Sequence, residues 1–252
     1  MDEGRFAFNP ELPWTMDHGP STKKMILQIE TATASCSVAL ANEGEVLALK
    51  QLAGRNVHAE MITLFIDEVI TSAGIKFENL DAVAVSSGPG SYTGLRIGVS
   101  TAKGLCYALG KPLIAVETLE AMASGLANRQ GYREDSSILL CPMIDARRME
   151  VYTAVFKADG GRVRPTAAEI IDEHSFADLL QDTKILFFGD GAEKCRETLG
   201  KNHNAFFLPD FVNSAADLTK KAFEKFSRKE FEDVAYFEPY YLKDFIAGKK
   251  KA

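Results

Sequence analysis

The chain has 252 residues, 46% hydrophobic and 25% charged, which is enough for one large or two small globular domains with hydrophobic cores. Its formal net charge of −6 argues against a protein that grips nucleic acid by itself, because such proteins carry a basic surplus. No apolar run approaches the roughly 18 residues of a membrane-spanning helix, and the beginning lacks the features of a secretory signal. We therefore expect a cytoplasmic protein without a membrane partner.

Residues 1–24 contain three prolines, the only tryptophan and no clear hydrophobic period, so we interpret them as an extension outside the fold. From Met25 onward the pattern is that of an α/β protein. The predicted elements are strands at 25–31, 35–41 and 46–52, a helix at 57–73, a strand at 80–86, a glycine-rich turn, a helix at 94–109 and a strand at 113–117.

A similar unit begins again near residue 137. We predict strands at 137–145, 150–158 and 163–170, a helix near 174–181, a strand at 184–189, a short helix near 192–199 and a longer helix at 214–229. The aromatic ending, which includes Tyr236, Tyr240 and Phe245, is expected to pack on the body because these side chains are costly to leave in water.

The two units align at their first strands. Glu30 and Asp145 both end a buried strand, and a turn glycine follows 14 residues later in one unit (Gly44) and 15 later in the other (Gly160). The alternative is a chance similarity of two hairpins. A duplicated β-β-β-α-β unit predicts two lobes of one topology.

The glycine-rich turn SSGPGSYTGLRIG, residues 86–98, resembles a phosphate cradle but does not match one. The P-loop requires a lysine after its last glycine, and none follows here. Gly88, Gly90 and Gly94 give a G-x-G-x-x-x-G spacing, one residue longer than the dinucleotide fingerprint. Pro89 replaces the first glycine of a nucleophile elbow around Ser91. We therefore expect a structural turn.

A stripe of small residues follows on the next helix, at Gly94, Gly98, Ala102 and Cys106. Helical glycine costs roughly 1 kcal/mol against alanine, so the stripe implies close approach of another backbone, either in this chain or in a partner. Helix 57–73 is apolar round much of its circumference and is expected to need a second partner. The predicted interface comprises this stripe together with His58, Met61, Ile62, Phe65 and Val69.

Metal and catalytic signals are weak. The histidines form no H-x-x-x-H pair, and no Ser/His/Asp set can be assembled, so we predict no metal site and no catalytic residue. The cysteines lack C-x-x-C spacing and are expected to be reduced and mostly buried; they are Cys36, Cys106, Cys141 and Cys195. Glu30 and Asp145 either hold metal-bound phosphate in a cleft between the lobes or cap turns.

Several stretches together resemble the TsaB (YeaZ) family from Met25 to Phe245. They are ILQIETATASCSVAL, VSSGPGSYTGLRIGVSTAKGL, PMIDARRMEVY and EPYYLKD. The resemblance implies a two-lobed actin-like ATPase (ASKHA) fold, each lobe a ribonuclease-H-like β-β-β-α-β-α unit. It also implies a role in forming N6-threonylcarbamoyladenosine in tRNA. The implied partners are the catalytic paralogue TsaD, which the first-lobe helices would contact, and the ATPase TsaE.

Departures from the family's nucleotide-binding relatives favour a non-catalytic subunit. Those relatives have an acid-x-Gly-Thr turn, whereas this chain has Glu30 followed by Thr31, Ala32 and Thr33. TsaD-like relatives carry H-x-x-x-H where this chain has His58 and Ile62. Gly189 and Gly191 resemble a remnant of a nucleotide loop.

We therefore predict a first lobe at 25–118 that docks the partner and a second lobe at 119–252 whose C-terminal segment packs back. The chain is expected to be a scaffold without a cofactor, to homodimerise when alone and to reach tRNA only through the complex. The alternatives are an ATP-binding enzyme or kinase of the same fold and, with less support, a metallopeptidase.

Overall fold

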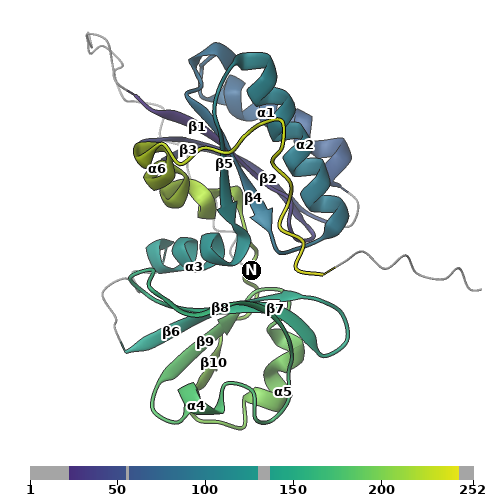
Figure 1. Ribbon diagram of the computed structural model, residues 1–252, viewed down its shortest axis with the longest axis vertical. Coiled ribbons are helices and arrows are strands. Elements are labelled where there is room, and N and C mark those ends of the chain that lie inside the picture. Colours follow the sequence, from purple (N-terminus) through teal and green to yellow (C-terminus); the bar gives the residue numbers. More distant parts are fainter. Residues whose placement is uncertain (1–22, 55–56, 130–136, 244–252) are drawn as a thin grey trace, which may run out of the picture.

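The computed structural model describes residues 23–54, 57–129 and 137–243. They form two five-stranded mixed sheets, one in the upper and one in the lower half of Figure 1. The predicted extension lies outside the described residues except for its last two, and Phe245 lies outside them too.

The first sheet has the strand order β3-β2-β1-β4-β5, with β2 antiparallel to both neighbours and β1, β4 and β5 parallel. Helices α1 (His58–Ser72) and α2 (Tyr92–Leu109) pack on the sheet, with the short 3-10 turn η1 (Phe77–Asn79) between them in the chain. The strands are β1 (Met25–Glu30), β2 (Ser35–Asn42), β3 (Glu45–Ala53), β4 (Ala82–Gly88) and β5 (Leu113–Glu117).

The second sheet repeats this arrangement. Its order, read from the β8 end as β8-β7-β6-β9-β10, places the third, second, first, fourth and fifth strands of the unit as in the first sheet, with the same parallel and antiparallel pairs. The strands are β6 (Ile138–Asp145), β7 (Glu150–Lys157), β8 (Arg162–Ile170), β9 (Lys184–Phe188) and β10 (Ala205–Phe207). The predicted two-lobed ASKHA fold and its internal repeat are confirmed.

Helices in the second unit are short: α4 is Ala177–Leu180, η3 is Glu193–Cys195 and α5 is Arg196–Leu199. The sequence did not predict the three-residue strand β10. In the first unit, α2 begins two residues before the predicted start because the Ser91 hydroxyl caps it, accepting a hydrogen bond from the Gly94 N–H at 3.2 Å.

Helix α3 (Thr118–Arg129), which was not predicted from the sequence, lies between the two sheets (Figure 1). α3 contacts β4 and β5 of the first sheet and β6 and β7 of the second. Its residues are buried round most of the circumference, as Leu119, Met122 and Leu126 show. A helix buried on several sides lacks the polar stripe that makes an amphipathic helix visible in a sequence.

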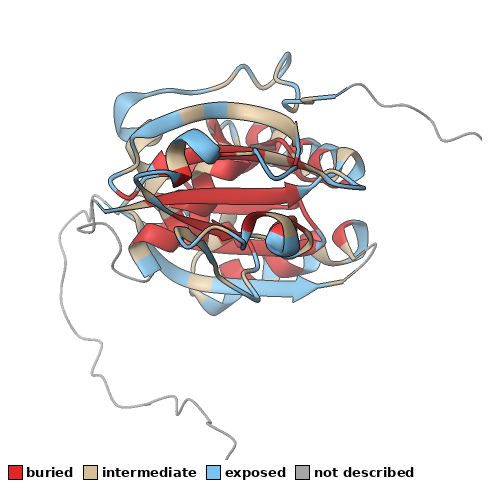
Figure 2. Ribbon diagram, turned by 90° about the horizontal axis from the view of Figure 1, so that it is seen from below, coloured by how far each residue is buried: buried red, intermediate tan, exposed pale blue. Residues whose placement is uncertain are grey.

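The predicted helix at 214–229 divides into the 3-10 turn η4 (Ala215–Leu218) and α6 (Thr219–Arg228). α6 packs on β1 and β5 of the first sheet and on α3. Figure 2 shows the resulting arrangement, with the buried strands enclosed and exposed residues on the outer elements.

The chain after α6 runs back along the first sheet and α2. The Lys103 ammonium donates to the carbonyl of Phe237 at 2.9 Å, and the Tyr240 N–H donates to the carbonyl of Ser87 at 2.7 Å. The backbone of this segment is therefore held against the first unit, but Tyr236 is 84% exposed, so the expectation that burial of the aromatic side chains drives this packing does not hold for Tyr236.

All four cysteines are free and buried, as predicted, and burial raises the pKa of Cys36 and of Cys106 to about 11. No helix in the described ranges combines the length and the apolar character that crossing a membrane requires.

Candidate functional site between the sheets and on helices α1 and α2

The carboxyl group of Glu30 ends β1 and is buried, with 1% of the residue exposed. Its Oε1 accepts hydrogen bonds from the Ala32 N–H at 2.5 Å and from the Ser86 hydroxyl at 3.0 Å. Burial raises the pKa of Glu30 to about 7, against the lowering effect of these hydrogen bonds. The turn after β1 thus directs one of its N–H groups at the protein's own carboxyl group.

The glycine-rich stretch packs directly on this turn. A Cβ atom on Gly90 would stand 2.4 Å from the Ala32 carbonyl oxygen, and one on Gly94 would stand 2.0 Å from the Thr31 carbonyl oxygen. The Ser91 N–H donates to the Ala32 carbonyl at 2.6 Å. Glycine is required because only a residue without a side chain permits this approach. The space beside the turn is therefore filled by the chain itself.

Gly98 continues the same contact one helical turn further on. A Cβ atom there would stand 2.2 Å from the Thr31 hydroxyl oxygen, and that hydroxyl donates to the Gly94 carbonyl at 2.8 Å. The sequence left open whether the small-residue stripe packs against this chain or against a partner. In the structure it packs against this chain. The stripe fits helix α2 to the turn that follows β1.

Eight of the nine predicted interface residues are buried within the chain; they are His58, Ile62, Phe65, Val69, Gly94, Gly98, Ala102 and Cys106. The ninth, Met61, is half-buried. These side chains fix α1 and α2 on their own sheet, so the idea that they form an open surface needs correction. The outward sides of the two helices instead expose Leu64 (46%) and Tyr107 (86%).

His58 has a structural contact in this arrangement. Its Nε2 lies 2.8 Å from the carbonyl oxygen of Thr33, at the end of the turn after β1. The first residue of α1 thereby holds the same turn that the start of α2 covers. This contact gives His58 a structural role, so a role as a metal ligand is not needed to explain its position.

Asp145, the counterpart of Glu30 in the second unit, is exposed. Its carboxylate pairs with the Lys194 ammonium and accepts a hydrogen bond from the Arg147 N–H at 2.8 Å. The Asp145 N–H in turn donates to the carboxylate of Asp190 at 3.0 Å. The side chain of Asp145 remains 49% exposed, so solvent reaches this acid.

The glycines after β9, which resemble a remnant of a nucleotide loop in the sequence, lie against the end of β6. Gly189 has φ +103°, and a Cβ atom on it would stand 2.4 Å from the Met143 carbonyl oxygen. A Cβ atom on Gly191 would stand 2.8 Å from the Ile144 carbonyl carbon. Like Gly90 and Gly94, these glycines follow the fourth strand of their unit, but they pack on the last residues of the first strand itself, whereas Gly90 and Gly94 pack on the turn after it.

A cavity of about 130 Å³ separates the turn after β1 from the Gly189 loop. It is lined mainly by apolar atoms, with Thr33 and Asn213 among its walls. The Thr33 hydroxyl donates to the side-chain oxygen of Asn213, which joins the first turn to the segment before η4. The structure therefore brings Gly189 close to the first turn, while Glu30 and Asp145 do not line the cavity.

Asp217, which was not predicted from the sequence as a site residue, is 2% exposed and lies close enough to Glu30 to be affected by its charge. Its Oδ1 is 2.9 Å from the guanidinium of Arg129, and its Oδ2 accepts a hydrogen bond from the Ser214 N–H at 2.9 Å. Burial raises the pKa of Asp217 to about 7, and the charge of Glu30 adds to this effect. The S-A-A-D capping box at 214–217 was a signal that could have identified it.

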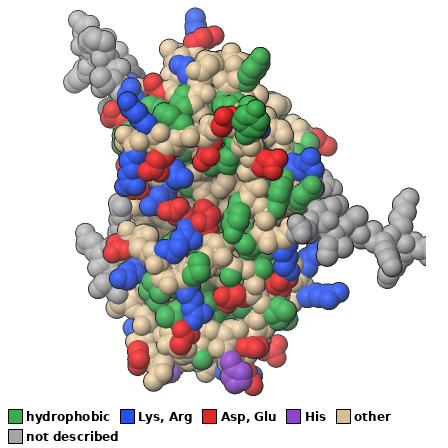
Figure 3. All heavy atoms as spheres, in the orientation of Figure 1, with side chains coloured by type: hydrophobic (Ala, Val, Ile, Leu, Met, Phe, Trp, Pro, Cys, Tyr) green, Lys and Arg blue, Asp and Glu red, His purple; other side chains and the backbone are tan. Residues whose placement is uncertain are grey.

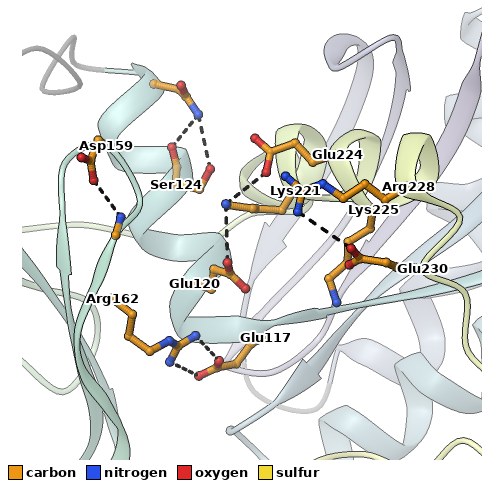
Figure 4. A network of polar contacts seen from close by, with 12 residues as sticks. Glu117, Glu120, Ser124, Asp159, Arg162, Lys221, Glu224, Lys225, Arg228 and Glu230 are labelled. Carbon is orange, nitrogen blue, oxygen red and sulfur yellow. Dashed lines mark hydrogen bonds and ion pairs between the residues drawn. The ribbon is translucent and has the colours of Figure 1, made fainter.

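Ion pairs join the elements around α3, as Figure 4 shows. Arg162 on β8 contacts Glu117 at the end of β5, with Nη2 and Oε2 2.5 Å apart. The Lys221 ammonium on α6 lies 3.5 Å from the Glu120 carboxylate on α3 and 3.1 Å from that of Glu224. Lys221 and Glu224 line a cavity of about 250 Å³, which we interpret as structural because their charges engage each other and α3.

A family model described as "TsaD: tRNA N6-adenosine threonylcarbamoyltransferase" matches residues 51–244. The chain is 33% identical to the tRNA threonylcarbamoyladenosine biosynthesis protein TsaB of Escherichia coli (strain K12), over 89% of this chain and 97% of that protein. It is 27% identical to the protein of the same description from Bacillus subtilis (strain 168), over 86% of this chain and 93% of that protein.

Two solved structures from Pseudomonas aeruginosa share the fold. One, described as an uncharacterized protein with similarity to peptidase YEAZ, has a TM-score of 0.73 and 25% identity, and covers 87% of this chain and 100% of its own. The other, described as YeaZ, has a TM-score of 0.72 and 26% identity over the same shares of the two chains.

Proposed function

This chain belongs to the TsaB (YeaZ) family and matches the TsaD family model over residues 51–244, so we propose that it takes part in making N6-threonylcarbamoyladenosine in tRNA. The observation that carries the proposal is the 33% identity with the E. coli protein across nearly the whole length of both chains. Within that role, the chain is a non-catalytic scaffold that binds a TsaD-type catalytic paralogue, with a TsaE-type ATPase joining the assembly.

The first unit supports the non-catalytic part of the proposal. A phosphate group at the end of β1 needs open backbone N–H groups and space beside the turn. Here the Ala32 N–H binds Glu30, and the backbone from Gly90 to Gly98 occupies the space beside the turn. A nucleotide would have to displace the start of α2.

The outward sides of α1 and α2 support the docking part. Both helices are fixed on the first sheet by their buried residues, so their outward side chains are held rigidly for a partner. Leu64, the half-buried Met61 and Tyr107 supply apolar contact area there. The buried stripe contributes by positioning the helices.

The charge distribution supports contact with tRNA through the complex. Figure 3 shows lysines and arginines interspersed with acidic side chains on the face in view, without a continuous basic region. With a formal net charge of −6, the chain has little to offer an RNA backbone on its own.

Co-purification with a TsaD-type protein tests the docking surface. We expect the wild-type chain to be retained, Leu64→Glu to lose most of the association and Ile170→Glu to behave as wild type, since Ile170 is 74% exposed on β8 of the second unit. Equal retention of the Leu64 and Ile170 variants would remove this interface from the proposal.

Calorimetry with Mg-ATP tests the alternative of an ATP-binding enzyme or kinase. We expect no binding to the chain alone. Tight binding that is abolished by Glu30→Gln would contradict the non-catalytic assignment and place a nucleotide at the end of β1.

A further inference from the structure

The turn between β6 and β7 carries two adjacent arginines, Arg147 and Arg148. Both are exposed, and both have a positive φ, 73° and 51°. Among the residues that the structure describes, they are the only two neighbouring non-glycine residues with this backbone conformation. Left-handed backbone is costly for a residue with a Cβ atom, so this turn keeps two arginines where its conformation favours glycine or asparagine. Strain of this kind is concentrated at functional sites.

Neither guanidinium group has an ion-pair partner in the described part of the chain. The two acids beside the turn are already paired with lysines, Asp145 with Lys194 and Glu150 with Lys243. Every other arginine that the structure describes contacts an acid or an aromatic ring; they are Arg96, Arg129, Arg162, Arg164, Arg196 and Arg228. The pair on the turn therefore presents two uncompensated positive charges to solvent.

The C-terminal segment brings further positive charge to the same turn. Lys243 pairs with Glu150 on β7, two residues after Arg148, and Figure 1 shows this end of the described chain beside the second unit. The sequence continues from Lys243 to three consecutive lysines at 249–251. Six residues of chain span at most about 20 Å, so these lysines stay within that distance of Lys243. We call the two arginines and the three lysines the basic region.

The composition of the basic region favours a nucleic acid over a protein as its partner. Lysine is depleted in protein–protein interfaces, whereas lysine and arginine together are the residues that contact phosphate backbones. A guanidinium group can bind two phosphate oxygens at once through its planar set of N–H donors. We propose that the basic region contacts the phosphate backbone of tRNA within the assembly, an inference that rests on the function proposed above.

The size of the basic region suits a contact made only within the assembly. Proteins that hold nucleic acid strongly make about 6–10 phosphate contacts, and this region offers five charges on a chain of net charge −6. The equivalent turn of the first unit, which follows Glu30, is buried under the start of α2 and contains no cation. The second unit alone offers this contact because its turn is exposed.

Binding of an unmodified tRNA transcript to the chain assembled with TsaD-type and TsaE-type proteins tests the contact. The variant is Arg147→Asn/Arg148→Asn, since asparagine accepts positive φ better than most side chains. We expect tRNA affinity to fall roughly tenfold or more at about 0.1 M salt. The slope of log affinity against log salt should become shallower by about 1.4–1.8, because each phosphate contact contributes about 0.7–0.9. An unchanged slope would overturn the proposal, because a purely structural effect lowers affinity equally at every salt concentration.

Arg196→Gln/Arg228→Gln is the matched control. It removes the same total charge, but both arginines are exposed and already paired, Arg196 with Glu193 and Arg228 with Glu230. We expect the wild-type slope. An equal change of slope in the control and in the turn variant would show that overall charge sets the affinity, and would overturn the assignment to the turn.

The unfolding temperature of the chain alone separates binding from stability. Arg147→Asn/Arg148→Asn removes no ion pair found in the described residues and relieves the left-handed backbone, so it should unfold at the wild-type temperature or about 2–4 °C above it. A lower unfolding temperature would show that the arginine side chains stabilise the turn, and would count against their retention for a partner.

Removal of residues 249–252 measures the share of the lysines. The salt slope of the assembly should become shallower by about 2.1–2.7 for three lost charges. Vesicles containing phosphatidylserine serve as the competing anionic surface, and we expect no binding of the wild-type chain to them at about 0.15 M salt. Vesicle binding that is lost with residues 249–252, together with an unchanged tRNA slope, would assign the lysines to a membrane and overturn the proposal.

Formation of N6-threonylcarbamoyladenosine by the same assemblies distinguishes failure of the contact from failure of the proposed function. If the wild-type assembly modifies tRNA and the turn variant keeps the wild-type salt slope, only the contact is wrong. If the complete wild-type assembly modifies tRNA equally well without this chain, the proposed function is wrong and the contact is overturned with it.

Discussion

The two units of this protein share a topology but treat the acid at the end of their first strand differently. In each unit a glycine loop after the fourth strand packs on the backbone at the end of the first strand or on the turn after it. Glu30 is nevertheless 1% exposed, whereas the side chain of Asp145 is 49% exposed and pairs with Lys194.

The element that follows the glycine loop explains the difference. In the first unit that element is α2, an 18-residue helix whose start covers the turn after Glu30. In the second it is a 3-10 turn of three residues and a helix of four, which leave the acid at the surface. The same topology therefore gives a buried carboxyl group or an exposed one according to the length of a single helix.

The largest predicted effect comes from a substitution that disrupts the packing of α2 on the turn after Glu30. In Gly94→Ala the new methyl carbon would stand 2.0 Å from the Thr31 carbonyl oxygen, a backbone atom that cannot move without displacing the turn. We expect a loss of stability at or above the upper end of the roughly 1–3 kcal/mol seen for overpacked sites. Urea unfolding at neutral pH measures it.

Gly104→Ala is the matched control on the same helix. A Cβ atom at Gly104 would meet no atom within 4 Å, so the substitution should stabilise by about 0.5–1 kcal/mol through helix propensity. Equal effects of the two substitutions would show that α2 does not press on the turn.

The next effect concerns the pH dependence of the buried acid. Glu30 has a pKa raised from 4.5 to about 7, so the folded state holds a proton that the unfolded state releases. Stability is therefore full below pH 4.5 and falls as the pH rises through 7. Glu30→Gln removes this titration, and its stability relative to wild type should improve by up to about 3 kcal/mol between pH 4 and pH 8.

Urea unfolding of both proteins across that range measures the difference. Asp217, whose pKa is also raised to about 7 and partly by the charge of Glu30, contributes a slope of the same sign, so the difference between the two proteins reports Glu30 together with its coupling to Asp217. Parallel curves for the two proteins would contradict the assignment of a protonated Glu30.

The smallest effect concerns the exposed acid. Asp145→Asn keeps an oxygen that accepts the hydrogen bond from the Arg147 N–H and removes the ion pair with Lys194. The side chain of Asp145 is 49% exposed and that of Lys194 is 23% exposed. Such pairs contribute about 1 kcal/mol or less, so unfolding should change by no more than that. A loss above about 2 kcal/mol would mean that the two acids are not as different as their exposure indicates.

Local patterns in the sequence determined much of the fold. Alternating and continuous apolar runs predicted nine of the ten strands, and helical spacing predicted α1, α2 and α6 within a few residues. The repeat of an acid-ended strand and hairpin predicted two units of one topology, and family motifs predicted the α/β architecture. These signals are readable because each depends on residues close together in the chain.

The tertiary structure decided which residues meet. The glycine stripe of α2 required a close neighbour, but only the fold shows that it is Thr31, more than sixty residues earlier. Asp217 joins Glu30 across 187 positions, and α3 is hidden in the sequence because both sheets bury it. β3 and β8 both read as strands, yet only the sheet order makes both of them edges. The hydrophobic period of a segment shows which of its faces is apolar. It does not show which distant segment of the chain packs against that face.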